Sequence, residues 1–145
     1  MSNHSDTHRV DILCQLIAAG RTAARQLASA LKSHQVREGE FRLLWLLRCV
    51  WQTSNLPDSP SQTELAAQLG QSTAQVSATV EQLRAQGVIA PIHSAGDRRC
   101  QAWELTPAGS ALVEKIAKQV ESQVDELNLP GGTAWLLPLF SQEAA

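Results

Sequence analysis

The residues best suited to chemistry in this chain are hydrogen-bonding side chains on one face of a predicted helix. With Val76, Val80 and Leu83 facing inward, the opposite face is polar or small. A glutamine amide can pair with adenine in the major groove of DNA, and alanine permits close approach to thymine methyl groups. The alternative is an ordinary solvated helix face. The candidate DNA-contacting residues of this segment are Gln71, Ser72, Thr73, Gln75, Ser77, Ala78 and Gln82.

A second candidate site is the charged turn formed by Asp97, Arg98 and Arg99. Adjacent arginines at a turn can enter a minor groove, where narrow A·T tracts concentrate negative potential. Asp97 would orient one arginine through a charge-assisted hydrogen bond. The simpler alternative is a solvated charged turn.

No pattern in the sequence predicts an enzyme, a metal site or a cofactor site. We find no paired carboxylates on one face, no nucleophile elbow, no glycine-rich phosphate loop and no metal-ligand spacing. The three cysteines, Cys14, Cys49 and Cys100, are far apart and odd in number, so they cannot form a disulfide framework. Cys14 and Cys100 are candidate redox residues, because nearby arginines would favour a thiolate. Packing is the simpler role for both.

Composition bounds the class of protein. The chain has 145 residues, 43% of them hydrophobic and 18% charged, which is typical of one globular domain. A net charge of −2 excludes a strongly basic, histone-like DNA binder. No apolar run is long enough for a membrane span, and the N-terminus does not resemble a signal peptide. We expect a cytoplasmic protein that lies on the nucleoid when bound to DNA.

The order of elements predicts a mainly α fold with a small β-hairpin wing. Long helices are expected over residues 10–32 and 39–52. Two capping-box patterns, at Ser61 and Ser72, then begin the two helices of a helix-turn-helix. Strands over 88–92 and 101–105 form the wing. A last helix begins at Thr106-Pro107, with the stripe Leu112, Ile116, Val120, Val124 and Leu127.

The first helix carries an apolar or small residue at alternating steps of three and four. This is the spacing of a helix-on-helix seam, so the helix either packs on its own core or forms a dimer. An apolar C-terminal segment, residues 133–140, is expected to dock on it. We divide the chain into a dimerisation helix (8–38), a winged helix-turn-helix (39–109) and C-terminal helices completing the dimerisation region (110–145). The seam residues are Val10, Leu13, Ile17, Gly20, Ala24, Leu27 and Leu31.

Four short motifs resemble those of the MarR family of winged-helix regulators. They are Ser61-Gln62-Thr63-Glu64-Leu65-Ala66, Gln86-Gly87-Val88-Ile89, Asp97-Arg98-Arg99 and Leu105-Thr106-Pro107-Ala108-Gly109. The resemblance implies a homodimer that binds a pseudo-palindromic operator in double-stranded DNA and is released by a small ligand or an oxidant. It also implies that Arg99 enters the minor groove while Arg98 pairs with Asp97 or contacts phosphate.

The chain departs from the family pattern at three positions. Ala78, Gln82 and Pro91 stand where the family often has arginine, so few phosphates are neutralised per subunit. This favours, as an alternative, a winged-helix protein-interaction module with weakened DNA binding. A cysteine-based redox regulator is the other alternative, because Cys14 resembles the reactive cysteine of the family's peroxide-sensing branch. That branch also uses tyrosines, and this chain has none.

A ligand is expected in the crevice between the dimer helices and the winged domain. Arg25, His34 and Arg42 are candidates to pair with a carboxylate or phenolate. Trp45 is the candidate aromatic wall, with Trp51 and Trp103 as further flat surfaces. The sequence thus predicts a small aromatic or anionic effector.

Overall fold

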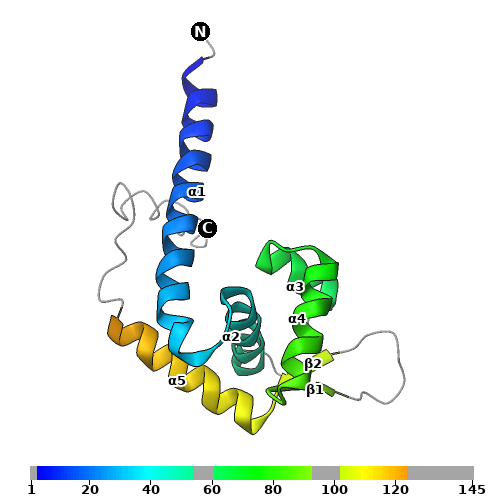
Figure 1. The fold of residues 1–145 in the computed structure, drawn as a ribbon. Coiled ribbons are helices and arrows are strands. Elements are labelled where there is room, and N and C mark those ends of the chain that lie inside the picture. The colour runs from blue at the N-terminus through cyan, green and yellow to red at the C-terminus, as the bar shows by residue number, and fades with distance from the viewer. Residues whose placement is uncertain (1–2, 54–60, 93–101, 124–145) are drawn as a thin grey trace.

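The structure, a computed structural model, describes residues 3–53, 61–92 and 102–123, without side chains for 3–8 and 50–53. Within these ranges the chain is mainly helical with a two-stranded antiparallel wing, as predicted (Figure 1). No helix of the described part is long and apolar enough to cross a membrane. The elements in order are α1 (Asn3–Leu31), η1 (Lys32–His34), α2 (Glu38–Thr53), α3 (Gln62–Leu69), α4 (Thr73–Ala85), β1 (Ile89–Ile92), β2 (Ala102–Leu105) and α5 (Pro107–Gln123).

The helix α2 forms the centre of the molecule. It lies between α1 and α5 on one side and the helix-turn-helix on the other (Figure 1). Its Leu43, Leu44 and Leu47 are buried and belong to one continuous apolar core. That core also includes Leu83 of α4 and Trp103 of β2, so α2 supports the winged unit from inside.

Both predicted capping boxes begin their helices. The Ser61 hydroxyl accepts from the Glu64 backbone N–H at 3.2 Å, and the Glu64 carboxylate accepts from the Ser61 N–H at 3.3 Å. Ser72 and Gln75 make the same reciprocal pair at 3.1 and 2.9 Å. Between the two helices Gly70 has φ +66°, a left-handed conformation that suits glycine. Local chemistry therefore determines where α3 ends and α4 begins.

The wing joins α5 through a tight contact of backbones. Thr106 donates its N–H to the Val88 carbonyl at 3.1 Å and its hydroxyl to the Gly87 carbonyl at 2.7 Å. The same hydroxyl caps α5 by accepting from the Gly109 N–H. A Cβ on Gly109 would lie only 2.0 Å from the Val88 carbonyl oxygen, so glycine is required there.

The N-terminal half of α1 extends away from the core (Figure 1). Leu31 at its C-terminal end is buried, but Val10, Leu13 and Ile17 are each more than half exposed. This half of the predicted seam therefore does not pack on the core of its own subunit. On α5, Ile116 is buried as predicted, but Val113, outside the predicted stripe, is also fully buried.

Candidate nucleic-acid interface and ligand pocket

The outer face of α4 is built as the sequence predicts. Val76, Val80 and Leu83 are buried, so this amphipathic helix holds its opposite face toward solvent. That face has hydroxyl and amide groups but no charge until its last turns. The predicted contact residues that are exposed are Ser72, Thr73, Gln75, Ser77, Ala78 and Gln82.

Three of the predicted DNA-contacting residues also have structural roles. Ser72 and Gln75 form the capping box, so their side chains are held against the backbone at the start of α4. Gln71 is half-buried, and its Nε2 lies 2.9 Å from where a Cβ on Gly39 would stand. Its buried Oε1 has no hydrogen-bond partner. Gln71 therefore packs between the turn and the start of α2.

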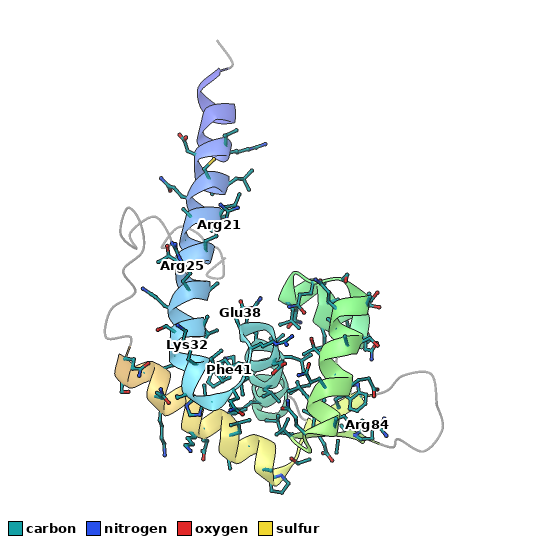
Figure 2. All side chains as sticks on the ribbon, viewed as in Figure 1. Arg21, Arg25, Lys32, Glu38, Phe41 and Arg84 are labelled. Atoms are coloured by element: carbon teal, nitrogen blue, oxygen red, sulfur yellow. The ribbon has the colours of Figure 1, made fainter. Side chains whose placement is uncertain are left out.

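The helix-turn-helix carries little positive charge. Within the described residues 61–92, Arg84 is the only lysine or arginine, and it lies 3.9 Å from the Glu81 carboxylate. Figure 2 shows Arg84 on α4, whereas Arg21 and Arg25 lie on α1. Ala78 and Gln82 lie on α4, and Pro91 pairs with Trp103 in the hairpin. The predicted wing residues Asp97, Arg98 and Arg99 lie outside the described residues.

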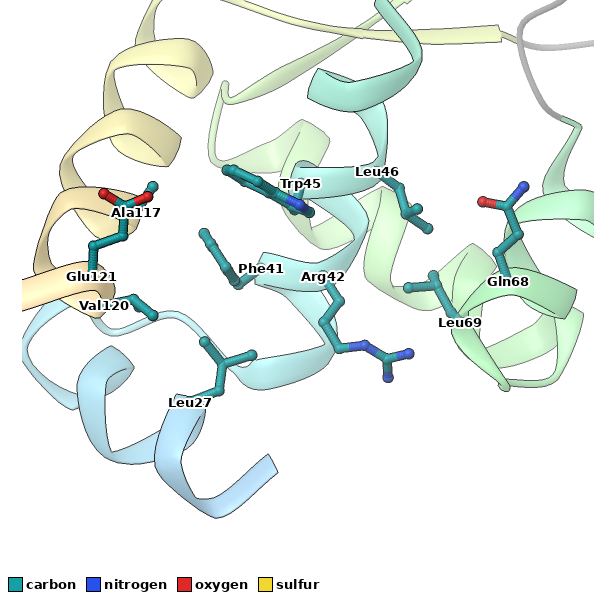
Figure 3. Close-up of a pocket in the computed structure, with 10 residues that line it drawn as sticks. All are labelled: Leu27, Phe41, Arg42, Trp45, Leu46, Gln68, Leu69, Ala117, Val120 and Glu121. Atoms are coloured by element: carbon teal, nitrogen blue, oxygen red, sulfur yellow. The ribbon is translucent and has the colours of Figure 1, made fainter. Parts of the chain in front are cut away.

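A pocket of about 370 Å³ opens between α1, α2, α3 and α5 (Figure 3). Its size lies within the range of small-molecule sites. Phe41 and Trp45 form an aromatic wall, with ring centroids 6.1 Å apart and planes tilted by 31°. The lining residues are Leu27, Phe41, Arg42, Trp45, Leu46, Gln68, Leu69, Ala117, Val120 and Glu121.

Only two of the predicted ligand-binding residues, Arg42 and Trp45, line this pocket. Arg25 donates to Thr22 on its own helix at 3.5 Å, and His34 is hydrogen-bonded to Gln119 of α5. Neither residue lines the pocket. Trp103 is only 2% exposed and belongs to the core, so the expectation that it supplies a pocket surface was wrong.

The sequence analysis missed most of the pocket wall. Phe41, Leu69 and Val120 come from three helices, and only Val120 belongs to an apolar stripe predicted above. No local pattern distinguishes a residue beside a pocket from one in a filled core, because the hollow depends on how the helices pack.

The two cysteines in the described part of the chain lie on different helices. Cys14 is exposed on α1, Cys49 is half-buried on α2, and Cys100 lies outside the described residues. Among the described residues no three histidine, cysteine or acidic side chains are placed to hold a metal ion. A redox role for Cys14 or Cys100 stays a prediction.

Comparisons with known proteins agree with this geometry. Residues 47–99 match the family model described as MarR family. The wild-type apo form of MarR from E. coli is 21% identical over 88% of this chain and 92% of its own, with a TM-score of 0.68. NadR in complex with 4-hydroxyphenylacetate is 21% identical over 92% and 89%, with a TM-score of 0.71. CouR bound to a 23-mer DNA duplex is 24% identical over 90% and 89%, with a TM-score of 0.66. Comparison with curated protein sequences gave no match.

The structural matches show the fold, and the family model covers the end of α2, the helix-turn-helix and the start of the wing. The chain therefore resembles MarR-family regulators in its fold, and residues 47–99 resemble them in sequence as well.

Proposed function

We propose that this protein is a dimeric regulator that reads a specific operator with α4 in the major groove. The observation that carries the proposal is the hydrogen-bonding face of α4, uncharged until its last turns and held outward by three buried side chains. Thr73, Ser77 and Gln82 are the exposed polar side chains on this face that are free of the capping box. Arg99 is the reading residue in the minor groove, and Arg98 pairs with Asp97 or contacts phosphate.

The apolar stripe on α1 supports the dimer. Val10, Leu13 and Ile17 are 58%, 59% and 55% exposed, and Leu16 beside them is 38% exposed. Large apolar side chains gathered on one surface favour an interface between protein chains. We assign residues 8–38 and 110–145 to the dimerisation region and 39–109 to the DNA-binding unit. A two-fold dimer presents two α4 helices to the two halves of a pseudo-palindromic operator.

The pocket is the proposed site of a small aromatic effector that weakens DNA binding. Its walls come from the DNA-binding unit (Leu69 of α3) and from the dimerisation region (Leu27 of α1 and Val120 of α5). A ligand wedged between them changes the position of the helix-turn-helix relative to the dimer. The complex of the structurally similar NadR with 4-hydroxyphenylacetate supports a ligand of this size.

Operator binding tests the proposal. We would titrate DNA flanking the gene of this protein, labelled with a fluorophore, at two salt concentrations and follow the anisotropy. Arg99→Ala should weaken operator binding by about 1–3 kcal/mol, because an arginine that reads the groove is lost. Lys118→Ala, which removes an exposed cation on α5, is the matched control and should bind as the wild type does. Equal affinities for all three proteins would remove the wing from the mechanism.

The nearly neutral helix-turn-helix favours a second candidate function. A winged-helix module that binds another protein needs no phosphate contacts. Residues 61–92 fit this function because their single arginine, Arg84, forms an ion pair with Glu81. Binding to random-sequence DNA at low salt separates the two functions. A regulator shows weak, salt-sensitive binding there. A folded dimer that binds neither random nor flanking DNA is the interaction module.

A further inference from the structure

The described lining of the pocket between α1, α2, α3 and α5 carries one cation, Arg42, and one carboxylate, Glu121. The Arg42 Nη1 lies 3.4 Å from the Glu38 carboxylate one helical turn away. The guanidinium is therefore already neutralised by its own helix. Arg25 and His34, the other expected partners of an anion, do not line the pocket.

Glu121 supplies a carboxylate that no side chain of the described residues neutralises. It extends from α5 beside the hollow, while Phe41 and Trp45 come from α2 (Figure 3). No ion pair or hydrogen bond joins its side chain to another described residue, although Arg42 lies in the same pocket wall. Because Glu38, which does not line the pocket, pairs with Arg42, Glu121 is the lining charge that no described residue balances.

The aromatic wall also favours a cation. The negative face of an aromatic ring attracts positive charge, most strongly for tryptophan. Trp45 already shows this preference, because the Arg48 guanidinium carbon lies 5.6 Å from its ring centroid. Arg48 does not line the pocket, and Trp45 is 41% exposed. Ring surface thus remains beside the apolar side chains of Leu27 and Val120.

We propose that this pocket selects a lipophilic cation, with its aromatic body against Phe41 and Trp45 and its positive group near Glu121. The inference rests on the proposed function for the role of the pocket, and it reverses the charge that the sequence predicted for the effector. An anion would have to compete with Glu38 for Arg42 and would meet the Glu121 carboxylate. A cation meets a carboxylate that no described residue pairs with, beside aromatic rings in a largely apolar pocket.

Calorimetry with three probes that share a naphthyl group and differ in charge tests the inference on the full chain without DNA. The probes are (2-naphthylmethyl)trimethylammonium, 2-naphthylethanol and 2-naphthylacetate, which are cationic, neutral and anionic. We expect the cation to bind about tenfold more tightly than the neutral probe, and the anion to bind more weakly than both. Glu121→Gln should remove this preference for the cation and leave the neutral probe within about twofold. Glu104→Gln, an equal charge change at an exposed position on β2, should retain it.

The result that overturns the inference is tighter binding of 2-naphthylacetate, or a cation preference that persists in Glu121→Gln. Binding of none of the three probes overturns it as well. Because the titration contains no DNA, these outcomes do not depend on whether the protein binds an operator. Loss of operator binding in the anisotropy assay would refute the proposed function and leave the ligand preference as measured.

Discussion

Replacing Gly109 with alanine should destabilise the protein at the junction between the wing and α5. The added Cβ would lie 2.0 Å from the Val88 carbonyl oxygen and 3.0 Å from its carbon. Both are backbone atoms, so no side-chain rotation relieves the contact. The start of α5 must shift away from β1, and two hydrogen bonds made by Thr106, at 3.1 and 2.7 Å, lie directly in the path of that shift.

The expected loss of folding free energy follows from two destabilising contributions and one stabilising contribution. Forcing one extra carbon into a tight contact costs about 1–3 kcal/mol. Losing the two Thr106 hydrogen bonds costs about 1 kcal/mol each. The better helix propensity of alanine returns up to about 1 kcal/mol. We therefore expect Gly109→Ala to lower the free energy of unfolding by about 2–4 kcal/mol.

Urea unfolding followed by far-ultraviolet circular dichroism measures this change. All variants must be compared at one protein concentration, because dimerisation shifts apparent stability. Ala111→Gly, at an exposed position on the same helix, is the control and should cost about 1 kcal/mol from helix propensity alone. If Gly109→Ala unfolds at the wild-type urea concentration or higher, the close approach of α5 to Val88 does not exist in solution.

Two further predictions concern the dimer and the DNA. Ile17→Glu should give a monomer at micromolar concentration, as measured by light scattering. The substitution places a charge on the exposed apolar stripe of α1, where burial of isoleucine in a dimer is worth about 1.5–3 kcal/mol. A dimer that persists in this variant would place the interface elsewhere. Arg84→Gln should change the slope of log affinity against log salt by less than about one unit per subunit, because Glu81 already pairs with this arginine. A larger change would show that Arg84 leaves Glu81 to contact phosphate.

The parts of the fold that local chemistry controls could be predicted from the sequence. Ser61 and Ser72 each precede a glutamate or glutamine by three residues, and both reciprocal caps formed as expected. Gly70 ended α3, and Thr106-Pro107 began α5. These features depend on residues within one helical turn, so their hydrogen bonds follow directly from spacing.

The site depends on packing between distant elements, and there the sequence was less informative. Nothing near Gln71 in the chain indicates that its amide packs against Gly39, 32 positions earlier. His34 was expected beside a ligand, but its ring is hydrogen-bonded to Gln119 on α5. Trp103 alternates correctly for a wing strand, yet it is buried in the core, where α2 and α5 both contact its strand. In each case the partner lies in another helix, and the spacing of residues within one helix does not predict which distant residue will contact it.

The position of the pocket gives a physical route from a ligand to α4. Leu69 lines the pocket and precedes Gly70, whose left-handed turn leads within two residues to the Ser72 cap of α4. A shift of Leu69 is therefore passed to α4 through a short and hydrogen-bonded turn. A ligand changes DNA affinity only by the difference between its affinities for the two arrangements. A hundredfold release from DNA requires about 2.7 kcal/mol of such difference. Burial of one aromatic side chain is worth about 1.5–3 kcal/mol, so a single ring that fits between Leu69 and Trp45 in one arrangement alone supplies this difference only when its burial is nearly complete.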